Sequence, residues 1–311
     1  MARHGVTLFA GKDVDLARTM DIQIPALTWV PAGVAYVRDF YVDRRALRVR
    51  AQSYDGGVRL SWESDTHLRN AAIERMIRAM FIGEMRKIRL PQNQALRQLQ
   101  EYYSGVILMR VPLVEALVVT ILSQNKTGEQ ARDAFMKMNT GLRGITAQAL
   151  VQATHERLRE LARKAGPYKA GYLKAVGKFV LDRGEDQLRS HLTGDTVGAL
   201  HSLLGVKGIG HKTAACVLVF FAGKQDIVPV DTHLWRVGSR LGLWAGSNGK
   251  KEELVQRSFV HRNTDSGSAH LLLVLLGRDK CHARQPKCEH CPVRLVCPAT
   301  RVEDRVHGGR L

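Results

Sequence analysis

The chain has 311 residues, enough for two or three modest domains with a sizeable hydrophobic core. It carries 47 Lys and Arg against 29 Asp and Glu, a formal net charge of +18, and 45% of its residues are hydrophobic. This composition excludes a disordered chain, and so large a basic excess indicates a polyanionic partner, either nucleic acid or a membrane surface. Because the basic residues are spread over the whole chain and are not gathered on one amphipathic segment, nucleic acid is favoured.

The sequence predicts no membrane partner. No apolar run approaches the roughly 20 residues that a membrane-spanning helix needs. The first residues, Met1 to Gly5, lack the apolar core of an export signal. We expect a monomer in the cytoplasm, associated with the nucleoid.

Residues 1–64 differ from the rest of the chain in their pattern of apolar and polar residues. Apolar and polar residues partly alternate over Ala35–Val42, Ala46–Ala51 and Val58–Trp62, as they do in half-buried antiparallel strands. Asp55-Gly56-Gly57 supplies a turn between the last two strands. These residues predict a small N-terminal antiparallel β-sheet domain.

From Thr66 onward the apolar period is helical, and the separators are rich in Gly, Pro, Asn and Asp. The pattern predicts a mainly α body with short connections. The expected helices are His67–Ile82, Gln92–Tyr103, Leu113–Ser123, Glu129–Met138, His155–Lys164, Lys169–Leu181, Thr196–Leu204, Lys212–Phe221, Thr232–Leu241 and Gly267–Arg278.

The segment Val206–Ala214, with sequence VKGIGHKTA, is a glycine-bounded turn that opens into an apolar helix. Glycines permit positive φ and a close approach to another molecule. The unpaired amides at the start of the helix favour an anion, so a phosphate is the natural ligand. The alternative is an ordinary Gly-x-Gly turn followed by a solvated lysine.

Four of the five cysteines lie in CHARQPKCEHCPVRLVC, as Cys281, Cys288, Cys291 and Cys297. Four thiolates in one compact loop can hold an iron–sulfur cluster. A structural zinc site is the alternative, although such sites usually pair their cysteines as two close doublets and only one doublet is present here. Arg284 and Lys287 make the loop basic, either for phosphate contact or as a solvated face.

The cysteine spacing, the hairpin GVKGIGHKTA and the later segment VPVDTHLWRV together resemble the endonuclease III branch of the helix-hairpin-helix (HhH-GPD) DNA glycosylases. The resemblance runs from about Glu115 to Cys297. It implies a two-domain helical fold with a [4Fe–4S] loop. It also implies a base-excision glycosylase with associated AP lyase activity that acts on double-stranded DNA, with oxidised pyrimidines as the leading substrate class.

By motif position the resemblance makes Lys212 the nucleophile and Asp231 the catalytic carboxylate. Asp231 precedes an expected helix, so it could be only an N-cap, and Lys212 could be only a DNA contact. Position matching puts Asn125 where the family fills the gap left by the extracted base, with Gln124 beside it; the alternative is a polar loop that ends a helix. The remaining expected DNA contacts are Gly208, Gly210, His211, Lys169, Arg284 and Lys287.

The resemblance implies three domains: 1–64, 112–226 with the hairpin, and 65–111 together with 227–311 around the cluster. DNA is expected to lie between the two helical domains, with Lys212 facing Asp231. The β-rich front end instead resembles 8-oxoguanine and 3-methyladenine glycosylases. A monofunctional glycosylase for alkylated or oxidised purines or mismatches, and a non-catalytic binder of damaged DNA, therefore remain as alternatives.

Overall fold

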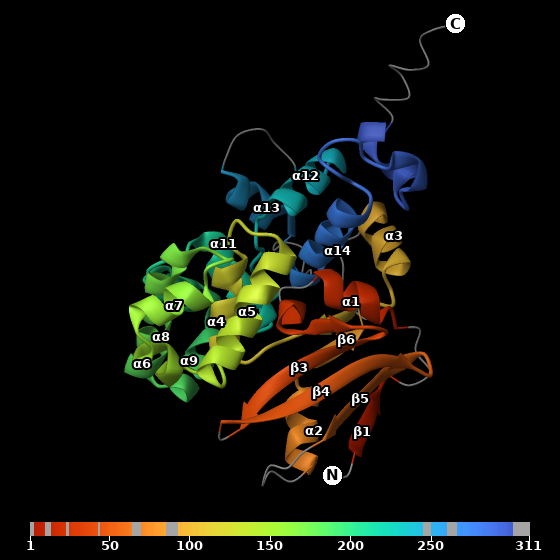
Figure 1. The fold of residues 1–311 in the computed structure, drawn as a ribbon. Helices are drawn as coiled ribbons and strands as arrows, with labels where there is room; N and C mark the ends of the chain where they lie inside the picture. The colour runs from red at the N-terminus through yellow and green to blue at the C-terminus, as the bar shows by residue number, and fades with distance from the viewer. Residues whose placement is uncertain are drawn as a thin grey trace, which may run out of the picture. The chain divides into compact units, whose positions relative to one another are not determined.

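The computed structural model describes residues 3–9, 14–22, 25–42, 44–63, 70–84, 93–244, 250–259 and 266–300. The chain divides into two compact units, both drawn in Figure 1. The first unit comprises residues 1–84 and 105–223, and the second comprises residues 85–104 and 224–311. The three-domain division expected from the sequence stays a prediction.

An antiparallel five-stranded sheet, in the order β1-β5-β4-β3-β2, forms the N-terminal part of the first unit. Side chains alternate along each strand, so in β4 Leu47, Val49 and Ala51 are buried on the inner face. Asp55 and Gly56 both have positive φ, as a tight hairpin turn between β4 and β5 requires. The predicted sheet and turn are confirmed. The strands are β1 (Arg3–Leu8), β2 (Val30–Ala32), β3 (Ala35–Val42), β4 (Arg45–Tyr54) and β5 (Gly57–Glu63).

The rest of the first unit is mainly helical, as predicted. Helix α4 is its central element, because all residues from Ala116 to Leu122 are buried. The observed bounds of α4 and α10 coincide with those predicted. The helices are α1 (Leu16–Ile22), α2 (Asn70–Arg78), α4 (Leu113–Ser123), α5 (Gly128–Leu142), α6 (Ala147–Gln152), α7 (His155–Leu161), α8 (Ala170–Arg183), α9 (Glu185–Thr193), α10 (Thr196–Leu204) and α11 (His211–Phe220).

The predicted helix His67–Ile82 is wrong at its end and begins outside the described residues. Helix α2 stops at Arg78, and Phe81 opens strand β6 (Phe81–Glu84), which pairs with β7 (Ile107–Met109). A partner strand so far along the chain gives no local signal, so the apolar residues after α2 fit a helix equally well.

A buried ion pair joins the sheet to α4. Arg38 in β3 is 1% exposed, and its guanidinium is paired with the carboxylate of Glu115 in α4. Its other terminal nitrogen donates to Thr28 Oγ1 at 2.6 Å. A charged contact therefore joins the sheet to α4.

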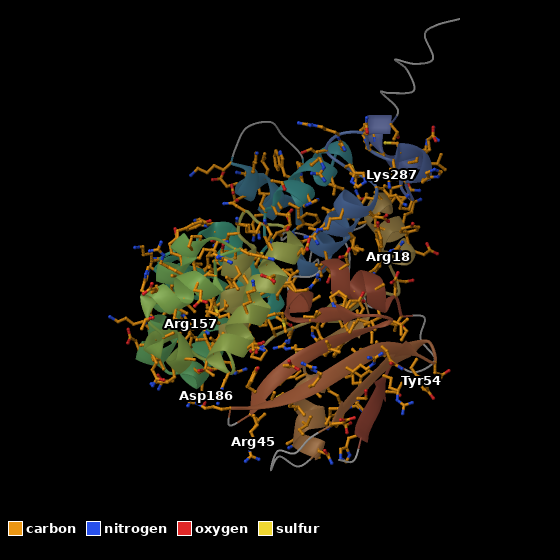
Figure 2. The ribbon with its side chains drawn as sticks, viewed as in Figure 1. Arg18, Arg45, Tyr54, Arg157, Asp186 and Lys287 are labelled. Carbon is orange, nitrogen blue, oxygen red and sulfur yellow. The ribbon has the colours of Figure 1, made fainter. Side chains whose placement is uncertain are left out.

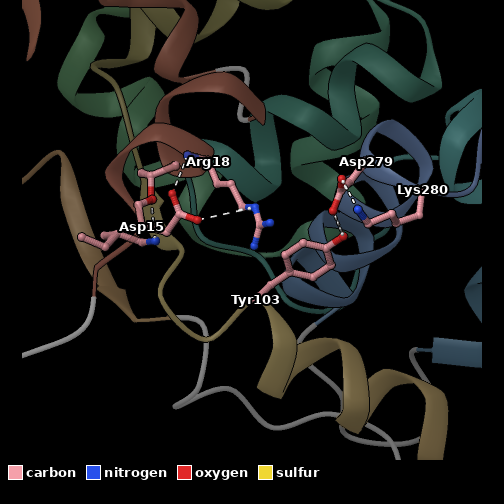
Figure 3. Close-up of polar contacts among 7 residues, drawn as sticks. Asp15, Arg18, Tyr103, Asp279 and Lys280 are labelled. Carbon is pink, nitrogen blue, oxygen red and sulfur yellow. Dashed lines mark hydrogen bonds and ion pairs between the residues drawn. The ribbon is translucent and has the colours of Figure 1, made fainter. Parts of the chain in front are cut away.

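The second unit contains α3 (Gln94–Tyr102), α12 (Thr232–Arg240), α13 (Lys251–Phe259) and α14 (Ser266–Asp279). Tyr103, just after α3, donates to Asp279 Oδ2 at 3.2 Å, and Lys280 is paired with the same carboxylate (Figure 3). Figure 3 also shows a contact of the first unit, in which Asp15 Oδ1 accepts from the Arg18 amide at the start of α1. In the described part of the chain, no helix is long and apolar enough to span a membrane.

Candidate functional site

The predicted hairpin is present between α10 and α11. Val206 and Ile209 are buried, which anchors the turn. Gly208 has φ +93 and lies against the ring of Tyr172 in α8, where a Cβ atom would come within 2.3 Å of the ring. Only glycine fits this position, both for its backbone conformation and for the space available.

Gly210 differs from Gly208. It is the N-cap of α11 with φ −97, and a Cβ atom there would meet nothing within 4 Å. His211 is exposed and Lys212 is half-buried in the first turn, where backbone amides have no partner within the helix. The space around Gly210 and this first turn is open, and phosphate binding there stays a prediction.

The loop after α4 lies against the hairpin. Gln124 is the C-cap of α4, and its side-chain Nε2 donates to Gly208 O and to Thr213 Oγ1, both at 2.9 Å. Asn125 is exposed and has φ +54, a left-handed conformation that Asn tolerates better than most residues. The side-chain amide of Gln124 is therefore hydrogen-bonded to the hairpin, whereas the side chain of Asn125 is open to solvent.

Lys169, expected to contact DNA, instead binds backbone carbonyls at the C-terminal end of α4. Its side chain is fully buried, and Nζ donates to Leu122 O at 3.0 Å and to Gln124 O at 2.8 Å. Burial, aided by the charge of Lys126, lowers the pKa of Lys169 to about 8. A side chain with no exposed surface presents nothing to a DNA backbone.

Asp231 is the N-cap of α12 in the second unit, and its Oδ1 accepts from the Leu234 amide at 2.7 Å. His233 is half-buried with Nδ1 3.1 Å from Arg236 Nη2, and burial lowers the pKa of its imidazole. This placement fits a packed histidine better than a phosphate contact. The capping role of Asp231 is present, and its expected position opposite Lys212 stays a prediction.

The cysteine loop of the second unit spans 281–297 and contains two short 3-10 helices, Cys288–His290 and Arg294–Val296. Its four cysteines, Cys281, Cys288, Cys291 and Cys297, line a single cavity. Burial raises the pKa of the Cys291 thiol, and the charges of the other three cysteines act in the same direction. The loop therefore gathers its four thiols around one space.

The donor set of this cavity fits a thiolate-bound group. No group of three or more His, Cys, Asp or Glu among the described residues is arranged to hold a metal ion, so the fit rests on the shared cavity. Arg240 also lines the cavity; it donates to Cys281 Sγ at 3.2 Å and to His282 O at 2.7 Å. Hydrogen bonds to sulfur and nearby positive charge stabilise thiolates.

Arg284 and Lys287 are exposed on the cysteine loop, and Figure 2 labels Lys287 there. Reasoning from the sequence missed Arg236 and Arg240, which fix the loop to α12: Arg236 Nε donates to Cys281 O at 3.0 Å. Their spacing of four residues on one helix face was the available signal. The fifth cysteine, Cys216, is 1% exposed in α11, as predicted for a buried small side chain.

Comparisons with known proteins show the family of the chain. The family model described as "HhH-GPD superfamily base excision DNA repair protein" matches residues 118–260. Endonuclease III of Sulfolobus acidocaldarius is 34% identical over 203 residues, which cover 64% of this chain and 87% of that protein. The chain belongs to the HhH-GPD superfamily. It is therefore a DNA glycosylase of base excision repair.

Other relatives extend the likeness of this HhH-GPD protein. Endonuclease III of Treponema pallidum is 33% identical over 185 residues, covering 58% of this chain and 81% of that protein. A Clostridium acetobutylicum 8-oxoguanine glycosylase/lyase bound to DNA matches 89% of this chain and 98% of its own, with TM-score 0.67 and 17% identity. A trapped endonuclease III–DNA covalent intermediate matches 67% and 95%, with TM-score 0.56 and 21% identity. These structures share the fold.

Proposed function

We propose that this HhH-GPD protein is a bifunctional enzyme that excises damaged bases, with oxidised pyrimidines as the leading substrates, and then nicks the strand through an AP lyase step. The observation that carries the proposal is the position of Lys212 in the first turn of the hairpin helix, beside the amides that follow Gly210. An amine beside a phosphate-binding helix start is held near the sugar of the same nucleotide.

Lys212 is the nucleophile in this proposal. Its uncharged amine forms a bond to C1′ as the N-glycosidic bond breaks, and the departing base takes up a proton. The amine loses a proton, the C1′–O4′ bond of the sugar ring breaks, O4′ takes up a proton, and a Schiff base forms between C1′ and Nζ. The Schiff base makes the C2′ proton acidic. Loss of that proton breaks the bond between C3′ and its oxygen and cuts the strand on the 3′ side.

Asp231 supplies negative charge beside the sugar, where positive charge develops as the base leaves. Its hydrogen bond to the Leu234 amide fixes the orientation of the carboxylate, so the capping role and the catalytic role are compatible. Asn125 fills the gap in the duplex, and the exposed groups His211, Arg284 and Lys287 contact phosphates.

Cys281, Cys288, Cys291 and Cys297 would hold a [4Fe–4S] cluster, which when bound serves to fix the loop that carries Arg284 and Lys287. Zinc in the same four-thiolate site is the alternative. Double-stranded DNA as the partner, a monomeric state and a location with the nucleoid belong to the same proposal, supported by the net charge of +18.

Borohydride trapping on duplexes with one abasic site tests the lyase step. The wild-type protein should form a covalent adduct, and Lys212→Gln should form none. Lys207→Gln, an exchange of a lysine in the turn itself, is the control and should keep the adduct. Absence of an adduct from the wild type would reject the lyase half of the proposal.

Oxidised purines are a second candidate substrate class, and one observation favours them. The match of 89% with the 8-oxoguanine glycosylase/lyase must include part of the N-terminal sheet, whereas endonuclease III matches 67% of the chain. A panel of duplexes, each with a single oxidised pyrimidine, oxidised purine, alkylated purine or mismatch, distinguishes these classes. Base release that needs alkali for strand breakage would indicate a monofunctional enzyme, and binding without release on every duplex would indicate a damage-binding protein.

A further inference from the structure

A continuous set of hydrogen bonds runs from Lys169 to the hairpin. Nζ of Lys169 donates to the carbonyls of Leu122 and Gln124, at 3.0 and 2.8 Å. The side chain of Gln124 in turn donates to Gly208 O and Thr213 Oγ1. One buried amino group thus holds the backbone of Gln124, whose side chain binds Gly208 in the hairpin turn and Thr213 in the first turn of α11.

The amino group of Lys169 lies where the backbone favours a cation. The last carbonyls of α4 carry the negative end of the helix dipole, and Leu122 and Gln124 belong to this end. Replacement of Lys169 by an apolar side chain would leave two inward-facing carbonyls without this donor.

Lys169 also binds the peptide unit that precedes Asn125. The carbonyl of Gln124 is part of the peptide unit that precedes Asn125, so a hydrogen bond to it fixes the orientation of that unit. Asn125 has φ +54, a conformation that persists when its surroundings enforce it. The backbone just before the exposed Asn125 is therefore held by a buried lysine that does not reach solvent.

A second contact from the same helix start reinforces the arrangement. Tyr172 lies three residues after Lys169, on the same face, and its ring packs directly on Gly208. Lys169 thus contacts the loop after α4, while Tyr172 contacts the hairpin turn. Both contacts come from one turn of helix.

We propose that Lys169 is a positioning residue that joins the loop Gln124–Lys126 to the first turn of α11, so that Asn125 and Lys212 move as one rigid body. Insertion of Asn125 into the duplex would then bring Lys212 to the sugar in the same motion. This inference rests on the proposed function, because it assigns Asn125 to the gap and Lys212 to the sugar.

Lys169→Met tests the inference, with Lys174→Met as the matched control. Lys174 lies in the same helix and also donates to a carbonyl near a helix end, but its partner is Val151 O at 2.6 Å, in α6 and not in the loop after α4. The measurements are affinity for undamaged duplex, affinity for a duplex with a tetrahydrofuran abasic analogue, and fluorescence of 2-aminopurine placed opposite the analogue.

Lys169→Met should lower the preference for the analogue over undamaged duplex by about tenfold to a hundredfold, which is the range expected for a lost hydrogen-bonded charge. The 2-aminopurine signal should fall with it, and single-turnover base release should slow to a similar extent. Affinity for undamaged duplex should stay within about twofold, since phosphate contacts dominate it. Lys174→Met should change none of these quantities.

A folded Lys169→Met protein with the wild-type preference and fluorescence signal would overturn the inference. If this variant does not fold, Gln124→Met replaces it, because that change removes the hydrogen bonds to Gly208 and Thr213 and leaves Lys169 in place. Wild-type preference in Gln124→Met would overturn the inference equally. A different result is that the wild-type protein releases no base while Lys169→Met still lowers the preference for the analogue. This pair of results would refute the proposed function and leave the joining role intact.

Discussion

The hairpin and the cysteine loop are held in different ways. The hairpin turn has buried anchors at Val206 and Ile209, and eight residues of α11 are buried behind it. In the cysteine loop, neither short 3-10 helix has a buried residue, and arginines from α12 hold the backbone around a cavity. The hairpin is therefore held by apolar packing together with the contacts from Gln124 and Tyr172. The cysteine loop, in which Val293 and Cys297 are buried, relies more on polar contacts and, in the proposed function, on a bound group.

The largest expected effect comes from the ion pair that braces α4. Arg38→Met leaves the carboxylate of Glu115 largely buried without its partner, and should lower the free energy of unfolding by about 3–5 kcal/mol. Urea unfolding measures it. Arg157→Met is the control, because the pair of Arg157 with Glu160 is exposed on both sides and should contribute no more than about 1 kcal/mol. Equal losses in the two variants would show that the buried pair adds no more stability than the exposed one.

The second effect is a pH dependence from Lys169. Its pKa in the folded protein is about 8, against an ordinary value of 10.5, so the unfolded chain binds more protons between these values. Stability must therefore rise with pH across this window, and Lys169 contributes least below about pH 8. The difference in unfolding free energy between wild type and Lys169→Met should move in favour of the wild type by up to about 3 kcal/mol between about pH 7.5 and 10.5.

This pH effect is measured as the difference in unfolding free energy between wild type and Lys169→Met, because the other lysines and the tyrosines titrate in both proteins. Urea unfolding of the two proteins at several pH values gives it directly. A constant difference across the window would mean that the amine of Lys169 is solvated, contrary to its buried position.

A smaller effect separates the two glycines of the hairpin. Gly208→Ala combines positive φ with overlap on the Tyr172 ring, and should cost about 1–3 kcal/mol of stability. Gly210→Ala has ordinary φ and open space, so its stability should change by less than about 0.5 kcal/mol. Gly210→Ala should nevertheless weaken binding to abasic duplex, because its methyl group occupies the space a phosphate would approach. Equal melting temperatures for both variants would contradict this distinction.

The last expected effect is on DNA affinity and comes from the cysteine loop. Cys291→Ser removes one thiolate of the proposed cluster site, and a folded variant should bind duplex at least about tenfold more weakly, close to 1.4 kcal/mol. The rate of single-turnover base release at saturating protein should change less than affinity, because the substitution leaves Lys212 and the capping hydrogen bond of Asp231 in place. Hydrogen exchange should report faster exchange in residues 281–297. Unchanged affinity and exchange would show that the loop does not need a bound group.

The same contrast explains what the sequence could predict. The bounds of α4 and α10 follow from local apolar period, and the four cysteines share a cavity because they lie within one short loop. Helix α9 was missed because only Leu188 and Leu192 are buried along it, too few to define a period. Helices α1, α6 and α13 and strands β1 and β2 were also missed; β1 pairs with β5, which lies far along the chain.

Lys169 shows the same limit within the site. Its sequence context, Gly-Pro-Tyr-Lys, is typical of an exposed helix-opening turn. The carbonyls that bind it belong to residues 45 and 47 positions earlier, so burial of the lysine depends on tertiary packing alone. The same holds for Arg38, whose partner Glu115 is 77 positions away.

Helix α12 carries Asp231 at its first end and Arg240 at its last, where Arg240 holds the cysteine loop. Nine helical residues form a stiff rod about 14 Å long. The helix therefore keeps the cysteine loop and the Asp231 carboxylate at a fixed separation. Contacts of the cysteine loop at the C-terminal end of α12 therefore help to set the orientation of the Asp231 carboxylate at its N-terminal end.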